Sequence, residues 1–123
     1  MQVSSITGRL GADPKLSYSD SGTPTARFSV AVERRRKVGS EWQSETVWHD
    51  VTVFGSLAEN VTESLAKGTD IIAIGRIESP RVYEKKDGTT AASLPFIADE
   101  IGVNLRWQLA GVTKLEKQTT EAF

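Results

Sequence analysis

Residues 45–55, ETVWHDVTVFG, alternate with a period of two, and this pattern constrains the fold more than any other in the chain. A β-strand places successive side chains on opposite faces of a sheet. Alternation divides this strand into an inner set, Val47, His49, Val51 and Val53, and an outer set, Trp48, Asp50, Thr52 and Phe54. The valines form the better core face, so the sequence predicts that Trp48 and Phe54 stand on an open face beside polar side chains.

A single helical segment interrupts a chain that otherwise has the short strands and turns of a small β protein. Apolar residues at positions 57, 58, 61 and 65 recur at helical spacing. We predict strands at residues 3–10, 15–18, 25–33, 46–54, 70–83 with interruptions at Gly75 and Pro80, and 93–105. Three long strands, one helix and two more strands is the element order of an OB-fold, a five-stranded Greek-key barrel. The predicted fold class is therefore all-β, with one helix between the third and fourth long strands, at residues 46–54 and 70–83.

The last part of the chain has its own pattern. Val103, Leu105, Trp107 and Leu109 alternate, which predicts a possible extra C-terminal strand. The length of 123 residues suits one domain. We expect an OB-fold domain over residues 1–110 and a short polar tail over residues 111–123.

Several classes of protein are disfavoured by residues that the chain lacks. There is no cysteine, which excludes disulfide scaffolds and thiolate metal sites, and His49 is the single histidine. His49 and its neighbour Asp50 point to opposite faces of a strand, so they do not form an acid–base pair. No glycine-rich phosphate loop is present. We therefore expect no enzymatic activity and no cofactor.

No membrane partner is expected either. The densest apolar run, residues 71–74, is far too short to cross a bilayer, and the N-terminus lacks the pattern of a secretory signal.

The positive charge is gathered into two stretches although the net charge is only −1. Residues 27–37 hold five bases and one acid, and residues 76–86 hold four bases and two acids. We predict that residues 34–42 form the tip of a charged hairpin. Clustered bases favour a polyanionic partner, and aromatic rings on an open face favour unpaired nucleic acid, where each stacked base contributes about 1–3 kcal/mol.

Three segments resemble bacterial single-stranded-DNA-binding proteins. They are ITGRLGADPKL at residues 6–16, ARFSVAV at 26–32, and TVWHDVTVFGSLAENVTESLAKGTDIIAIGRI at 46–77. The resemblance covers residues 1–106. It implies an OB-fold that assembles as a homotetramer and wraps single-stranded DNA over its surface. It further implies a role in DNA replication, repair or recombination, and a cytoplasmic, nucleoid-associated location.

The resemblance also implies which residues contact DNA. Trp48 and Phe54 match the stacking aromatics of the family, and Tyr83 is the nearest match to a third. Where the family has another aromatic, this chain has Arg34-Arg35-Arg36, whose guanidinium planes can also stack on bases; Trp42 is an alternative source of that ring. The expected nucleic-acid-binding residues are Trp48, Phe54, Tyr83, Arg9, Arg34, Arg35, Arg36, Lys37, Trp42, Arg81 and Lys85.

Some family members use an extra C-terminal strand to join subunits. For Trp107 we therefore favour burial at a subunit interface over contact with DNA. Typical members also end in an acidic tip with Pro-Phe that recruits other proteins, whereas this chain ends in TTEAF. That ending implies a tail-poor paralogue, with a truncated form as the alternative, and leaves recruitment by this route doubtful.

Two other functions fit the same residues. One is an OB-fold protein-interaction adaptor of the primosome type, with weak affinity for DNA. The other is a binder of structured RNA or of single strands in general.

Overall fold

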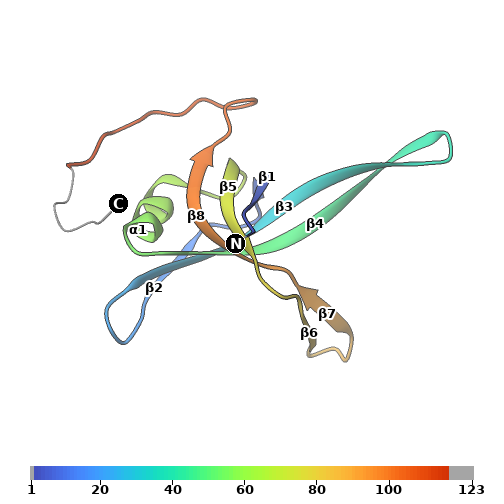
Figure 1. Cartoon of the computed structure of the whole chain (residues 1–123), viewed down its shortest axis with the longest axis horizontal. Coiled ribbons are helices and arrows are strands. Elements are labelled where there is room, and N and C mark those ends of the chain that lie inside the picture. Colours follow the sequence, from blue (N-terminus) through green and yellow to red (C-terminus); the bar gives the residue numbers. More distant parts are fainter. Residues whose placement is uncertain (1, 117–123) are drawn as a thin grey trace.

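The structure, a computed structural model, describes residues 2–116; Met1 and residues 117–123 lie outside the described part. It contains β1 (Ser4–Leu10), β2 (Lys15–Tyr18), β3 (Pro24–Val38), β4 (Glu41–Phe54), α1 (Ser56–Ser64), β5 (Asp70–Ile77), β6 (Arg81–Glu84), β7 (Thr90–Ser93) and β8 (Pro95–Val103) (Figure 1). Of the expected polar tail, residues 111–116 form neither helix nor strand, and the TTEAF ending lies outside the described residues.

Five strands close into a barrel in the order β1–β5–β8–β4–β3, because β3 also pairs with β1 at Arg9/Ala31 and Leu10/Val30. β4 and β8 run parallel, and the other neighbouring strands run antiparallel. An extra strand, β2, pairs with the edge of β3. Helix α1 follows β4 and packs against β2, β3, β4 and β8. The predicted five-stranded OB barrel with one helix is thus confirmed.

The core contains Val51 and Val53 of the four residues that alternation assigns to the inside, whereas Val47 and His49 are only partly buried. Val51 and Val53 of β4 are sealed, and Ala58, Val61 and Leu65 cover them from the helical segment. The largest fully buried side chains are Phe96, Leu10, Ile71, Val30, Val51 and Val53. Burying a side chain of this size contributes about 1.5–3 kcal/mol.

Gly75 lies where β5 bends. The pairing of β5 with β8 shifts register between Ile74 and Gly75, which marks a bulge. A Cβ atom on Gly75 would lie 1.9 Å from the carbonyl oxygen of Ile97, a distance that no real side chain could occupy. Glycine is therefore required here for the two strands to approach.

The β3 and β4 strands are longer than predicted. They pair without interruption from Thr25/Phe54 to Val38/Glu41 and form a ribbon that projects well beyond the barrel (Figure 1). The turn lies at Gly39 and Ser40 alone. Residues 34–42 do form the charged tip of this hairpin, as predicted, but most of them belong to the paired strands. The strand bounds at residues 33 and 46 were too short, because consecutive charged residues hide the period-two pattern that reveals a strand.

The region predicted as one interrupted strand at residues 70–83 is divided in two. β5 ends at Ile77, and β6 pairs with β7 in a separate hairpin. The expected turn at Asp87-Gly88 is confirmed: the Lys85 N–H donates to the Thr89 carbonyl oxygen at 2.7 Å.

The alternating residues 103–109 do not form the strand that we expected there. β8 ends at Val103, and the chain then turns at residues 105–107. The physical reason is that no strand of the described chain lies alongside, and the side chain of Gln108 bonds to the backbone of Asp70 instead.

Candidate nucleic-acid interface

Three aromatic side chains share the outer face of β4. Trp42, Trp48 and Phe54 follow one another at intervals of six residues. Because this spacing is even and β4 pairs with β3 without interruption, all three side chains point to the same face. A strand advances ~3.3 Å per residue, so neighbouring rings lie roughly 20 Å apart. Trp48 and Phe54 are 51% and 50% exposed, whereas Val51 is 1% exposed. The predicted open aromatic face is confirmed.

The ring of Trp48 lies against Gly11. A Cβ atom at Gly11 would be 2.5 Å from Cζ3 of the indole and 2.9 Å from Cη2. The Gly11 N–H donates to the Ser29 carbonyl oxygen at 3.0 Å, which fixes this backbone beside β3. One side of the indole is thus supported by the protein while half of its surface remains open.

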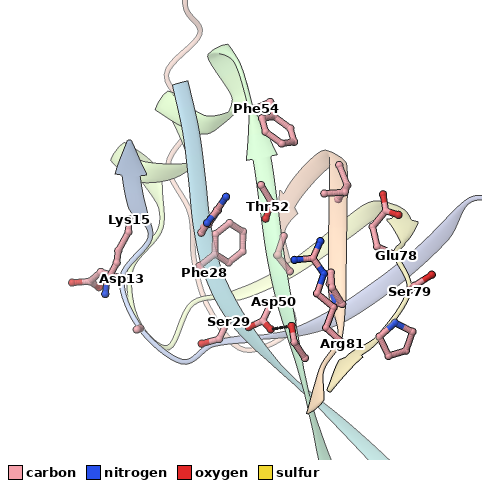
Figure 2. Close-up of a pocket in the computed structure, with 17 residues that line it drawn as sticks. Asp13, Lys15, Phe28, Ser29, Asp50, Thr52, Phe54, Glu78, Ser79 and Arg81 are labelled. Atoms are coloured by element: carbon pink, nitrogen blue, oxygen red, sulfur yellow. Dashed lines mark hydrogen bonds between the residues drawn. The ribbon is translucent and has the colours of Figure 1, made fainter. Parts of the chain in front are cut away.

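A groove of about 930 Å³ runs along the same wall of the barrel. Figure 2 shows Phe54 at one end, with Lys15 on one side and Arg81 on the other. Three bases border it, Lys15, Arg27 and Arg81, and so do three acids, Asp13, Asp50 and Glu78. The charges are balanced by number, so the groove carries separate basic and acidic side chains and is not a uniformly positive channel.

Lys15 and Arg27 were missed from the sequence. The register places Lys15 beside Arg27, and Arg27 beside Thr52, on adjacent strands. Arg27 could have been found, because the inward alternation of Ala26 and Phe28 requires it to point outward. Lys15 could not, because its position depends on the pairing of β2 with β3.

The β6–β7 hairpin places Arg81 at the border of the groove, and Tyr83 follows two residues later on the same strand. These two side chains share one face of β6, and Arg81 pairs opposite Ser93. The Ser93 hydroxyl donates to the Asp50 carboxylate, which ties the hairpin to the barrel (Figure 2). Tyr83 is half exposed, and Lys85 is exposed at the start of the hairpin turn.

The basic run of β3 is divided between two faces of the ribbon. Arg35 and Lys37 lie on the face of Trp42 and Trp48, since they pair with Ser44 and Trp42. The Arg35 Cζ atom lies 5.4 Å from the centroid of the Trp42 ring, a cation–π contact. Arg34 and Arg36 point to the reverse face, where Arg34 lies opposite Glu45.

Arg9 lies apart from the groove. Its Nε atom is 3.3 Å from Oδ1 of Asp70, and the arginine side chain is largely exposed. A surface pair of this kind contributes little to stability, so the guanidinium remains available to a ligand. Arg9 borders a separate, smaller hollow together with Arg106 and Trp107.

His49 lies on the inner face of β4, half buried. Its ring packs edge-on against Phe96 at 6.3 Å between centroids, and its Nδ1 atom is buried without a hydrogen-bond partner among the described residues. Burial lowers the pKa of His49 below its ordinary value of 6.5, partly offset by the charge of Asp50 and a backbone hydrogen bond at Leu94.

Residues 2–116 contain no cluster of three or more metal-ligating side chains. No helix in this part of the chain has the length and apolar character needed to cross a membrane.

Comparisons with known proteins agree with this geometry. The sequence pattern of the single-strand binding protein family matches residues 1–104. A "Single-stranded DNA-binding protein" of Paenarthrobacter aurescens is 36% identical over 119 residues, which cover 94% of this chain and 69% of that protein. One of Mycobacterium tuberculosis (strain ATCC 25618 / H37Rv) is 35% identical over 115 residues, covering 91% and 70%.

The fold has a solved counterpart. The crystal structure of a small single-stranded DNA-binding protein from Streptomyces coelicolor superposes with a TM-score of 0.71 at 27% identity, covering 85% of this chain and 94% of that one.

Proposed function

Because the chain belongs to the single-strand binding protein family, we propose that it binds single-stranded DNA without strong sequence preference and without catalysing a reaction. The observation that carries the proposal is the half-exposed pair Trp48 and Phe54 on the outer wall of the barrel. Every base has a π-face, so stacking on such rings contributes about 1–3 kcal/mol per base whatever the sequence.

Phosphate contacts complete the proposed interface. In the groove we assign them to Lys15, Arg27 and Arg81, which border it beside Phe54. Tyr83 and Lys85 extend the path along the β6–β7 hairpin, with the tyrosine as a further stacking ring.

On the ribbon we assign contacts to Trp42, Arg35 and Lys37, which share the face of Trp48. Arg34 and Arg36 lie on the reverse face and add positive potential to the same arm. A DNA strand would thus cross the barrel between two projecting arms, the β3–β4 ribbon and the shorter β6–β7 hairpin (Figure 1).

We further propose that the protein acts as a homotetramer. Ile72 and Ile74 are partly exposed on the outer face of β5, outside the groove, and apolar side chains grouped in this way suit contact with another copy. When the binding surfaces of four subunits hold one DNA strand, the effective concentration of each further site raises the overall affinity. Unpaired DNA arises during replication, repair and recombination, which are the processes in which we place this protein, at the nucleoid.

A titration with poly(dT), monitored by tryptophan fluorescence at several salt concentrations, tests the proposal. We expect quenching, and an affinity that falls as salt rises because bound phosphates release counterions. Absence of both quenching and a mobility shift at low salt would overturn it. A protein partner combined with weak DNA affinity, unchanged in Trp48→Ala, would instead support an adaptor. Competition between poly(dT) and poly(U) separates a DNA binder from a general single-strand binder.

A further inference from the structure

The segment after β8, residues 104–116, presents an arginine and a tryptophan to a second hollow. This hollow has a volume of about 330 Å³ and is bordered by Arg9, Ala31, Thr46, Arg106 and Trp107, among others. It is distinct from the groove beside Phe54, with which it shares no lining residue.

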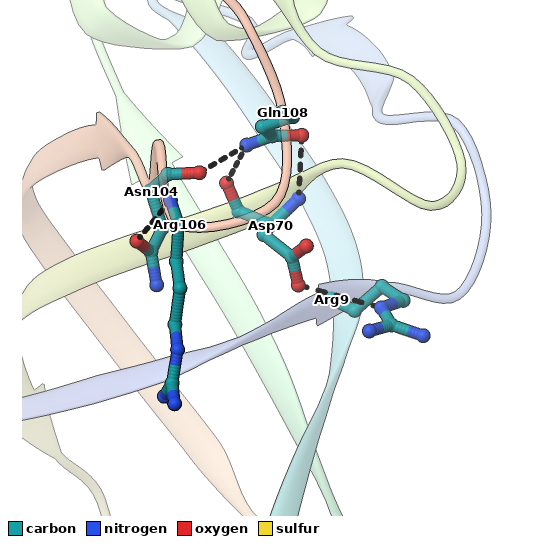
Figure 3. Close-up of polar contacts among 5 residues, drawn as sticks. All are labelled: Arg9, Asp70, Asn104, Arg106 and Gln108. Carbon is teal, nitrogen blue, oxygen red and sulfur yellow. Dashed lines mark hydrogen bonds and ion pairs between the residues drawn. The ribbon is translucent and has the colours of Figure 1, made fainter.

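Hydrogen bonds fix the segment in place even though it is not a strand. The Gln108 side-chain amide donates to the carbonyl oxygens of Asp70 and Asn104, both at 2.7 Å, and its oxygen accepts from the Asp70 N–H at 3.3 Å (Figure 3). The Arg106 N–H donates to the side-chain oxygen of Asn104 at 3.2 Å. Trp107, between Arg106 and Gln108, is therefore held beside β5.

Trp48 stands between the hollow and the groove. Along β4, Asp50 borders the groove on one side of Trp48, and Thr46 borders the hollow on the other. Across the sheet, Trp48 pairs with Ala31, and Ala31 pairs with Arg9. Neighbouring strands lie about 4.8 Å apart, so Arg9 is roughly 10 Å from Trp48 along the wall. The hollow thus continues the groove beyond Trp48.

The side chains around the hollow suit a nucleotide. Trp107 is 75% exposed, and the Arg106 Cζ atom lies 5.2 Å from the centroid of its ring. A guanidinium on one face leaves the other face of the indole free for a base. Arg9 and Arg106 can hold phosphates. Glu33, which also borders the hollow, would repel a phosphate but can accept a hydrogen bond from a base amino group.

We infer that this hollow is a further nucleotide subsite, in which a base stacks on Trp107 while Arg9 and Arg106 hold the flanking phosphates. The inference rests on the proposed function and extends its DNA path past Trp48 to the C-terminal segment. The rival use of Trp107 is the subunit interface predicted from the sequence. The charged side chains beside the indole suit DNA better than the apolar centre of an interface.

The decisive experiment leaves Trp107 as the only indole of the full chain, by Trp42→Phe with Trp48→Phe. In the free protein we expect the emission of a water-exposed indole, quenched when a dT oligonucleotide binds. Blue-shifted emission before DNA is added, or unchanged emission in a complex that anisotropy of the labelled oligonucleotide shows to be saturated, would overturn the subsite.

Affinity measurements on the otherwise unaltered chain provide a second test. Trp107→Ala should weaken binding of a long dT oligonucleotide about fivefold, the equivalent of roughly 1 kcal/mol of stacking. Leu109→Ala is the matched control, because Leu109 is fully exposed on the same segment and lies outside the hollow. Unchanged affinity in Trp107→Ala, or a loss that accompanies dissociation of the oligomer, contradicts the subsite. If the unaltered protein binds no oligonucleotide at all, the proposed function itself fails.

Discussion

At the scale of single residues, DNA binding is proposed to depend on Trp48 more than on any other side chain, because its open ring lies between the groove and the second hollow. Trp48→Ala should weaken binding of a dT oligonucleotide by roughly five- to 150-fold, corresponding to about 1–3 kcal/mol of stacking. Fluorescence anisotropy of a labelled oligonucleotide measures this. Trp48→Phe keeps an aromatic plane and should restore most of the affinity. Equal affinities for the alanine variant and the unaltered protein would contradict stacking at this position.

Gly11 offers a way to displace the same ring without removing it. In Gly11→Ala the new methyl group would lie 2.5 Å from the indole, so the ring must turn away. The obstructing atom belongs to a surface side chain, and we therefore expect little change in thermal stability. DNA affinity should fall about fivefold as roughly 1 kcal/mol of stacking is lost. Thermal melting and anisotropy on the same sample separate the two effects, and a misfolded variant would show itself by a lower melting temperature.

The lowered pKa of His49 predicts that the stability of the protein depends on pH. Its folded-state pKa lies below the ordinary 6.5, so the unfolded chain binds more protons at acidic pH. The contribution of this group to the free energy of unfolding is fully present above about pH 6.5 and is lost as the pH falls toward the folded-state pKa. His49→Gln should show a smaller loss than the unaltered protein between about pH 7.5 and about pH 5.5. Urea unfolding at both pH values measures it; equal losses would contradict this account.

At the scale of elements, the alternation of side chains along the β3–β4 ribbon divides its basic residues between two opposite faces. Arg35 and Lys37 share the face of Trp42, whereas Arg34 and Arg36 point to the reverse face. The double variant Arg35→Ala/Lys37→Ala should weaken DNA binding and reduce the slope of log affinity against log salt by about 1.4, since each phosphate contact on a single strand contributes about 0.7.

The pair Arg34→Ala/Arg36→Ala is the control for this ribbon. It removes the same formal charge from the opposite face, so its salt slope should change less. Identical slopes for the two double variants would mean that the ribbon acts only through its total charge.

The elements also show where sequence reading succeeds and where it fails. The strand containing Trp48 and the helix containing Val61 were predicted because apolar periodicity reports burial directly. The full length of the ribbon was not, because beyond Val32 neither face is buried and no apolar pattern marks the strand. The neighbour Lys15 was missed for another reason: which strands pair is decided by long-range contacts.

At the scale of the whole molecule, assembly should control affinity for long strands. Ile72→Glu places a charge on the apolar outer face of β5 and should reduce the mass of the assembly in sedimentation. Affinity for a long oligonucleotide should then fall by about 10²-fold or more as linkage between sites is lost. Binding of an oligonucleotide that is short enough for one chain should stay unchanged. A variant that keeps both its mass and its long-strand affinity would argue against assembly through this face.

The unbroken pairing of β3 with β4 has an evolutionary consequence. Adding or deleting one residue between Trp42 and Trp48 would turn Trp42 to the reverse face, whereas a change of two residues there would keep its orientation and only move it along the arm. Natural length variation in this arm should therefore occur in even steps on each strand. Homologues with odd insertions should carry a compensating bulge or have lost the outermost ring.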